Sequence, residues 1–162
     1  MSRGTRLAFS LVELMIVIAI VAFLATISIP SYFKYLAKAK QTEVALNLAS
    51  LHAAELSYWA SNGTYSAKLA GSGGVGWEPA GYKAGHKPNF YYTYGFQSSD
   101  QTGGISYFVG KLNTSVDHLK NTFANNNDFV AAAAADLLGN GHIDIWTIDE
   151  NRNITHVEDG LA

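Results

Sequence analysis

The chain has 162 residues, of which 48% are apolar, and its formal net charge is −2. This length is typical of one domain, and the charge gives no case for a generally basic surface, so we do not expect nucleic acid to be a primary ligand. The sequence contains no cysteine, which excludes disulfides, thiolate nucleophiles and zinc–cysteine sites.

A long apolar segment follows a short basic stretch at the N-terminus. Arg3 and Arg6 precede a run from Phe9 to Ile29 in which Glu13 is the only charged residue. About 20 apolar residues are enough to cross a bilayer as a helix. A carboxylate inside such a span costs roughly 2.5 kcal/mol or more, so we expect Glu13 to have a function. The arginines predict that the N-terminal side stays cytoplasmic.

The helix is predicted to continue beyond the apolar run. Pro30 ends that run and should bend the helix, because proline removes one backbone hydrogen bond. Residues 31–60 then carry an amphipathic apolar stripe, formed by Val44, Leu48, Leu51 and Tyr58. Ser61, Asn62 and Gly63 are typical of a helix C-terminus.

The remainder of the chain is predicted to form loops and strands. The glycine-rich residues 71–89 indicate a loop, in which Trp77 and Tyr82 are expected to form a surface flap. Alternating aromatic residues over 90–96 indicate a strand with one buried face.

Further predicted elements follow in chain order. They are a hairpin loop over 98–104, a strand over 105–112, a short helix over 116–124 and strands over 129–135, 143–148 and 154–157. The alanine-rich segment 129–135 is assigned to a central strand on which the long helix can pack closely.

These elements predict an α+β fold in which one long N-terminal helix packs on an antiparallel β-sheet. The helix has a membrane-spanning half and an amphipathic half. We divide the chain into a leader at 1–8, a hydrophobic transmembrane or filament-core helix at 9–30, and an amphipathic helix with a globular β domain at 31–162.

The segment Ala8-Phe9-Ser10-Leu11-Val12-Glu13 resembles the class III signal of type IV pilins and type II secretion pseudopilins. In that family a basic leader is cut just before a Phe-Ser/Thr-Leu-x-x-Glu-like apolar segment. Pro30, Tyr32 and Tyr35 fall where the family usually has a proline and aromatic residues. Ala8 departs from the usual glycine before the cut but is similarly small.

Two other kinds of N-terminal segment remain as alternatives. A cleaved secretory signal has a shorter apolar stretch and an Ala-x-Ala-like site after it, which this run does not show. An ordinary signal anchor would not need Glu13 in its first turns.

The resemblance implies a set of roles for this segment. A prepilin peptidase would cut between Ala8 and Phe9 and methylate the new Phe9 amine. Phe9 of one subunit and Glu13 of another would then pair in a homopolymeric filament of type IV pilin-like fold. An inner-membrane assembly platform and an assembly ATPase would be partners, and membrane lipid would surround the helix before assembly.

A second motif, at 136–144, has two readings. Asp136, Asn140, Gly141 and Asp144 occupy places of the calcium-loop pattern, and Asp149 is a further candidate oxygen ligand. Leu138 stands where another oxygen ligand is expected, and the alternative is a plain turn joining two strands. Six of the 13 acidic residues follow residue 135, against Arg152 alone.

The sequence does not indicate an enzyme. The five histidines are scattered, and HExxH and GxSxG motifs are absent. The expected function is a structural major subunit of a type IV pilus. A major pseudopilin of a type II secretion system is the alternative, and a membrane-anchored binding module that does not polymerise is a third. The precursor is expected to cross the inner membrane once, and then to enter an extracellular pilus or a periplasmic pseudopilus.

Overall fold

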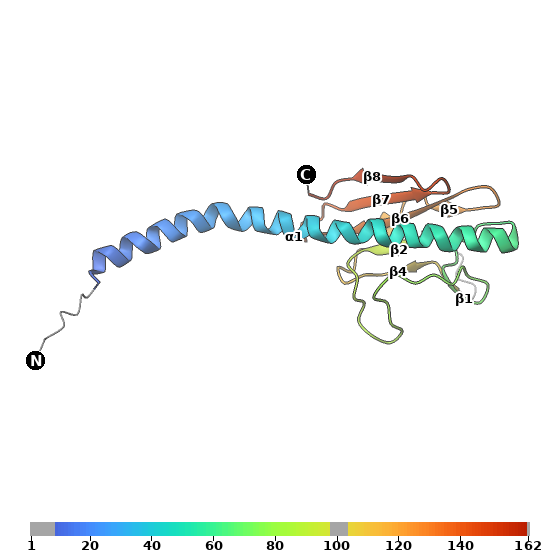
Figure 1. Cartoon of the computed structure of the whole chain (residues 1–162), viewed down its shortest axis with the longest axis horizontal. Coiled ribbons are helices and arrows are strands. Elements are labelled where there is room, and N and C mark those ends of the chain that lie inside the picture. Colours follow the sequence, from blue (N-terminus) through green and yellow to red (C-terminus); the bar gives the residue numbers. More distant parts are fainter. Residues whose placement is uncertain (1–8, 98–103, 162) are drawn as a thin grey trace, which may run out of the picture. The chain divides into compact units, whose positions relative to one another are not determined.

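The computed structural model describes residues 9–97 and 104–161. The chain divides into two compact units, one ending at Leu36 and one running from Ala37 to Ala162. Helix α1 (Leu11–Asn62) contributes to both units (Figure 1). The leader predicted at 1–8, with Ala8, and most of the predicted loop at 98–104 lie outside the described residues.

The described part of the first unit is an apolar helix whose large side chains are exposed. All of the large apolar side chains from Phe9 to Leu36 are 43–78% exposed. Among the described residues, α1 is the one helix that is long and apolar enough to cross a membrane. Its helical backbone is continuous through position 30, and the bend expected at Pro30 stays a prediction.

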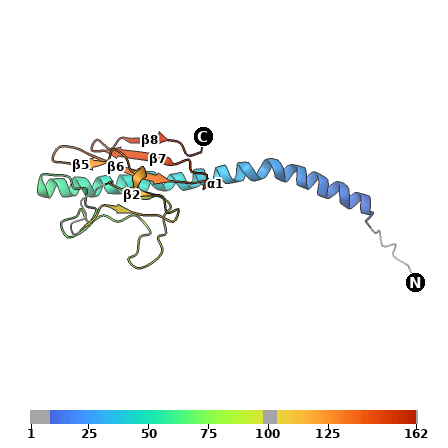
Figure 2. The ribbon, with the colours of Figure 1, turned by 180° about the vertical axis from the view of Figure 1, so that it is seen from behind.

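The second unit contains the amphipathic part of α1. Ala37, Val44, Leu48 and Leu51 are at most 1% exposed and belong to the main core cluster. The helix ends at Asn62, and Gly63 follows with φ of +70°, which confirms the predicted C-terminus. Figures 1 and 2 show this part of α1 lying across one face of the sheet.

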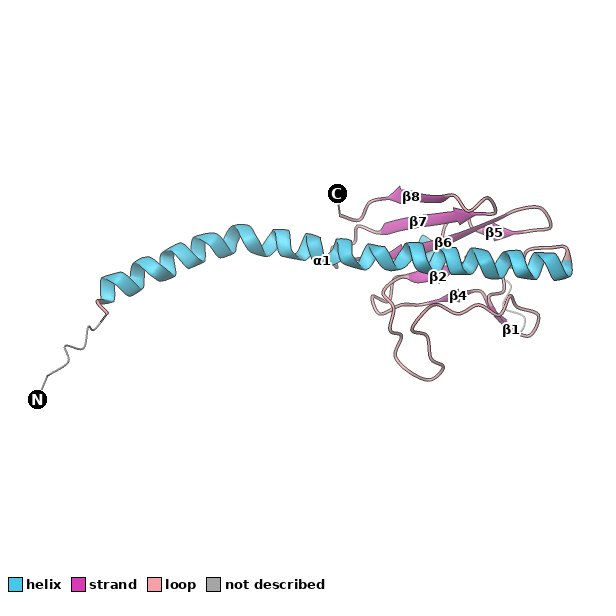
Figure 3. Ribbon diagram, in the orientation of Figure 1, coloured by secondary structure: helices cyan, strands magenta, loops and turns pink. Residues whose placement is uncertain are grey.

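The sheet is antiparallel and has six strands. Its strand order is β4-β2-β6-β7-β8, and β5 pairs with β6 beside this path. These strands are β2 (Thr93–Gly95), β4 (Tyr107–Phe108), β5 (Phe123–Ala124), β6 (Phe129–Ala135), β7 (Asp144–Asp149) and β8 (Ile154–Glu158). Strands β1 (Ala70–Gly71) and β3 (Gly104–Ile105) form a separate pair. Figure 3 shows the loops that join them.

Strand β6 confirms the central position predicted for the alanine-rich segment. All five alanines from Ala131 to Ala135 are fully buried. Ala131, Ala133 and Ala135 belong to the main core with α1, whereas Ala132 and Ala134 belong to a second cluster with Leu119. Small side chains on both faces let the helix and the η1 turn (Val116–His118) approach the sheet closely.

The aromatic face predicted over 90–96 is also confirmed, although the strand is shorter. Phe90, Tyr92, Tyr94 and Phe96 are each at most 1% exposed, while β2 itself covers three residues. The predicted helix over 116–124 is wrong in extent, because a three-residue 3₁₀ turn is followed by β5.

The surface flap predicted at Trp77 is wrong. Trp77 is 5% exposed, and its indole Nε1 donates to Ser50 Oγ of α1 at 2.9 Å. Its ring also makes edge contacts with Tyr94 and Phe108. The glycine-rich loop is therefore fastened to the helix by a buried aromatic residue.

Candidate functional site

The N-terminal turn of α1 carries the first candidate site. Ser10 precedes the helix, and its Oγ accepts a hydrogen bond from the Glu13 N–H at 3.1 Å. A serine cap followed three residues later by glutamate has the spacing of a capping box. Phe9 lies just before this turn and is 78% exposed. The structure thus places Phe9 and Glu13 at the same end of an apolar helix.

The hydroxyl groups near Pro30 are satisfied within the helix. Thr26 Oγ1 donates to the Phe23 carbonyl at 2.7 Å, and Ser28 Oγ donates to the Leu24 carbonyl at 2.9 Å. Such bonds let hydroxyl groups lie in an apolar environment at little cost, although they tend to bend a helix.

A buried carboxylate connects the main parts of the second unit. Asp144, the first residue of β7, is fully buried and accepts five hydrogen bonds. The donors are Gln41 Nε2 at 3.0 Å, Tyr92 OH at 2.5 Å, Trp146 Nε1 at 2.7 Å, His156 Nε2 at 2.8 Å and Gly160 N at 3.2 Å. One side chain therefore joins α1, the approach to β2, β7, β8 and the C-terminal segment.

The donors decide the charge state of Asp144. Burial alone raises the pKa of its carboxyl group, but hydrogen bonds from Tyr92, His156, Trp146 and Gly160 outweigh burial and leave the pKa below its usual 3.8. Burial and the hydrogen bond to Asp144 raise the pKa of Tyr92. The His156 ring stacks on the Trp146 ring, with centroids 3.9 Å apart.

Gly160 is needed at the end of this network. A Cβ atom at position 160 would lie 2.7 Å from Asp144 N, which is closer than real Cβ contacts allow. The backbone of the C-terminal segment can therefore reach the Asp144 carboxylate only through a glycine.

A second polar cluster fastens the loop before β2 to the helix. Glu43 Oε1 accepts from Tyr94 OH and from Tyr91 N, each at 2.9 Å. Asn47, one helical turn later, donates to Tyr94 OH at 3.2 Å and accepts from Ala80 N at 3.0 Å. These contacts join the middle of the glycine-rich loop, at Ala80, and the segment after it, at Tyr91, to α1.

Glu55 is the least satisfied buried acid among the described residues. Its Oε2 accepts from Ser66 N at 3.1 Å, whereas Oε1 is buried without a hydrogen-bond partner. Burial raises the pKa of Glu55 to about 7, and the Ser66 hydrogen bond lowers it only in part. Sequence reasoning missed this residue, because the helical pattern showed only that it fills a turn.

The four predicted calcium ligands lie in three different hydrogen-bond environments. Asp136 accepts from the backbone N–H groups of Gly139, Asn140 and Gly141 within its own turn. Asn140 Oδ1 accepts from His142 N, and Asp144 belongs to the buried network.

The fourth candidate, Asp149, accepts from Asn151 and Asn153 in the β7–β8 turn. These bonds leave its pKa below the usual value, although burial acts in the opposite direction. Calcium binding stays a prediction, because these hydrogen bonds do not test it.

One group of three side chains could hold a metal ion within the described part of the chain. Asp144, His156 and Asp159 each offer a ligand atom within 4.8 Å of the others. The Asp144 oxygens already accept five protein donors, and Asp159 Oδ1 accepts from Leu161 N. Through His156 and Gly160 N, Asp144 also joins β8 and the C-terminal segment to β7.

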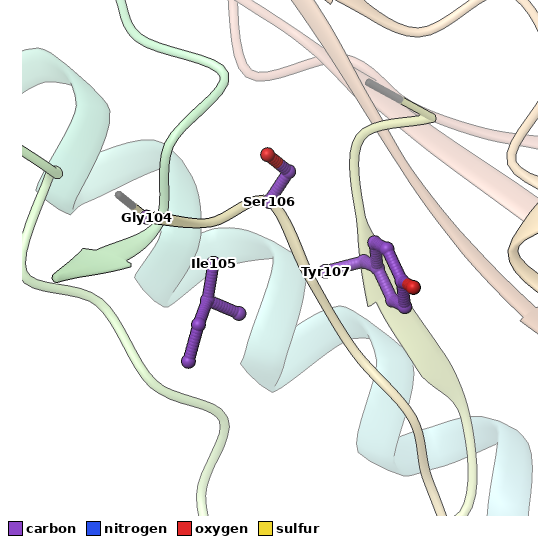
Figure 4. A pocket seen from close by; sticks show the side chains of 4 residues that line it. All are labelled: Gly104, Ile105, Ser106 and Tyr107. Carbon is purple, nitrogen blue, oxygen red and sulfur yellow. The ribbon is translucent and has the colours of Figure 1, made fainter. Parts of the chain in front are cut away.

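A depression of about 210 Å³ lies beside β3 and β4, lined by Gly104, Ile105, Ser106 and Tyr107 (Figure 4). The Ser106 hydroxyl is buried and has no hydrogen-bond partner among the described residues. Its described lining residues include no acid, histidine or cation, and their polar side-chain groups are the hydroxyls of Ser106 and Tyr107.

Comparison with known proteins places the N-terminal segment in a family. Residues 4–29 match the prokaryotic N-terminal methylation motif. A 58-residue segment is 45% identical to the type IV major pilin protein PilA of Myxococcus xanthus (strain DK1622), covering 36% of this chain and 26% of that protein. A 74-residue segment is 39% identical to the fimbrial protein EcpC of Eikenella corrodens, covering 45% of this chain and 48% of that protein.

The matched segments thus span about a quarter and about half of the two relatives. The methylation motif, these relatives and the α+β fold identify the chain as type IV pilin-like, as the resemblance of residues 8–13 indicated. Neither relative is described as an enzyme.

We expect Asp144→Asn to destabilise the second unit by about 3 kcal/mol, because an amide directs its own N–H groups toward surrounding donors. Denaturation of the full chain in detergent measures this loss. Glu78→Gln, at an exposed position, should change stability by about 0.5 kcal/mol or less. Equal stability of the two variants would show that the Asp144 network contributes little.

We expect the stability of the wild-type unit to fall as the pH rises from about 4.5 to about 7. The pKa of Glu55 is higher in the folded chain, so the folded state binds the proton more tightly and its advantage is lost on ionisation. The loss approaches about 3 kcal/mol. Glu55→Gln should remove this component, and melting temperatures at pH 5 and pH 8 test it. An unchanged pH dependence in the variant would contradict the assignment.

Proposed function

We propose that the chain is a structural major subunit of a type IV pilus filament. The observation that carries this proposal is the segment from Phe9 to Leu36, in which every large apolar side chain is exposed along a helix. An exposed apolar surface of this kind needs lipid or neighbouring apolar helices around it. Lipid serves before assembly, and copies of the same helix serve in the filament.

Glu13 is proposed to make this packing selective. A carboxylate in an apolar environment needs a cationic partner. Cleavage after Ala8 creates an ammonium group at Phe9, which is the cation that lies at the same end of the helix. A staggered neighbour brings Phe9 of one subunit to Glu13 of another, and this pair fixes the position of each new subunit along the filament.

The remaining partners follow from the same proposal. A prepilin peptidase processes the precursor in the inner membrane, and an assembly platform with its ATPase extracts the helix from lipid. One relative is named a major pilin and the other a fimbrial protein. Both names support a surface filament over a secretion pseudopilus.

The first expectation concerns processing. The mature chain should begin at Phe9 and carry one methyl group on its amine, because Ala8 is small and the apolar segment starts immediately after it. Intact-mass measurement of protein from membranes tests this. A chain that retains Met1 or Ser2, or one cut beyond Ile29, would contradict the assigned site.

The second expectation concerns Glu13. Glu13→Ala should leave membrane insertion and cleavage intact but reduce filament yield by about tenfold or more, because the ammonium of the next subunit loses its partner. Sheared filaments are quantified against membrane-bound subunit.

Two matched variants separate charge from helix capping. Glu13→Gln keeps a side chain suited to a capping box but removes the charge, so it should fail like Glu13→Ala. Ser10→Ala removes the observed cap and keeps the charge, so it should assemble. Normal filaments from Glu13→Gln would refute the ion-pair role.

A further inference from the structure

The two edges of the six-stranded sheet carry opposite charges. Residues 79–97, in the loop and strand beside β4, include Lys83 and Lys87 but no acid, exposed Glu78 precedes them, and Lys111 follows β4. At the β8 side, Glu158 and Asp159 are exposed acids. Strands β4 and β8 form opposite ends of the strand order, and Figure 1 shows them on opposite sides of α1 within the second unit.

The basic edge has a defined surface. Lys87, Pro88, Val109 and Lys111 line an open groove of about 650 Å³. Lys111 Nζ donates to Asn89 Oδ1 at 2.7 Å and lies 5.3 Å from the centre of the Tyr91 ring. Lys87 and Lys111 are exposed, and Val109 is 37% exposed between them. We call this surface the basic edge.

The acidic edge also combines charged side chains with an exposed valine, but its charges are negative. Glu158 and Asp159 are exposed at the end of β8, next to Val157, which is 53% exposed. Lys120 lines a depression together with Glu158. The positive charge of Lys120 therefore offsets the charge of Glu158 more than that of Asp159. We call Val157, Glu158 and Asp159 the acidic edge.

The strand directions place the two edges at the same end of the sheet. Every pairing in the order β4-β2-β6-β7-β8 is antiparallel, so β4 and β8 run in the same direction. Strand β4 ends at Phe108, shortly before Val109 and Lys111, and β8 ends at Glu158, just before Asp159. The lysine and the two acids therefore lie at the corresponding ends of β4 and β8.

We propose that the basic edge of one copy of this chain binds the acidic edge of the next copy. The proposal rests on the proposed filament function. Lys87 and Lys111 approach Glu158 and Asp159, and the two valines meet between these charges. The contact uses different surfaces on its two sides, so it does not close into a dimer and repeats from subunit to subunit. Charge complementarity of this kind selects the partner and its orientation.

Charge reversal in the full chain tests the contact. Lys87→Glu with Lys111→Glu should reduce filament yield by about tenfold or more, because like charges then face each other. Glu158→Lys with Asp159→Lys should have the same effect. All four substitutions in one chain restore opposite charges at every contact and should recover filaments. Asp117→Lys with Glu78→Lys changes the net charge equally at other exposed sites and should assemble normally.

Cross-linking tests the geometry directly. The chain has no cysteine, so Lys111→Cys with Asp159→Cys can form disulfides only at the introduced positions. Oxidised filaments should give a ladder of multimers, and each single variant should give at most dimers.

Several results would overturn the inference. They are normal assembly of both charge-reversed pairs, failure of the fourfold variant to recover a chain that still melts like the wild type, or absence of the ladder. Failure of the wild-type chain to form filaments would instead refute the proposed function.

Discussion

The folded unit depends on a single buried carboxylate. Moving an ion out of water costs several kcal/mol, so Asp144 is tolerated only because donors surround it. Hydrogen bonds to charged groups contribute about 1.5–3 kcal/mol each, and five of them exceed the cost of burial. Strand β8 needs this support, since four of its five residues are exposed and it buries little apolar surface.

The same helix meets two environments with different rules for polar groups. Between Leu11 and Leu36, hydroxyl groups bond to carbonyls of their own helix, which suits a solvent without donors or acceptors. Beyond Ala37, polar side chains such as Glu43 and Asn47 reach across to loops and strands instead. The first part is therefore suited to sliding between lipid and other helices, whereas the second part is fixed to one fold.

Local patterns predicted the elements that depend on neighbouring residues. The apolar stripe of α1 was found because its period of 3.6 is visible in the sequence, whereas the alanine-rich central strand and the last two strands were found as short segments between turn residues. The buried positions of Trp77 and Glu55 were not predicted. Each is decided by partners distant in sequence, such as Ser50 for Trp77, and a glycine-rich loop gives no signal of what lies beneath it.

The candidate calcium motif shows that partners distant in the sequence also limit the prediction of sites. Spacing alone placed Asp136, Asn140 and Asp144 around a glycine turn, and the turn exists. Spacing cannot show that Asp144 points into a network that includes Gln41, 103 residues earlier in the chain. By contrast, Ser10 and Glu13 interact across three residues, so that contact could be read directly.

In the proposed filament, charged groups make the contacts between subunits specific. Apolar attraction between helices is non-directional, so it holds subunits together without fixing where each one stops. Glu13 supplies an axial reference inside the helix bundle. The charged edges of the sheet are proposed to supply a lateral reference outside it, and the strand directions bring both edges to the same end of the sheet. The Asp144 network holds β8 and the C-terminal segment in place. The same network therefore positions the acidic edge for its proposed contact with the next subunit.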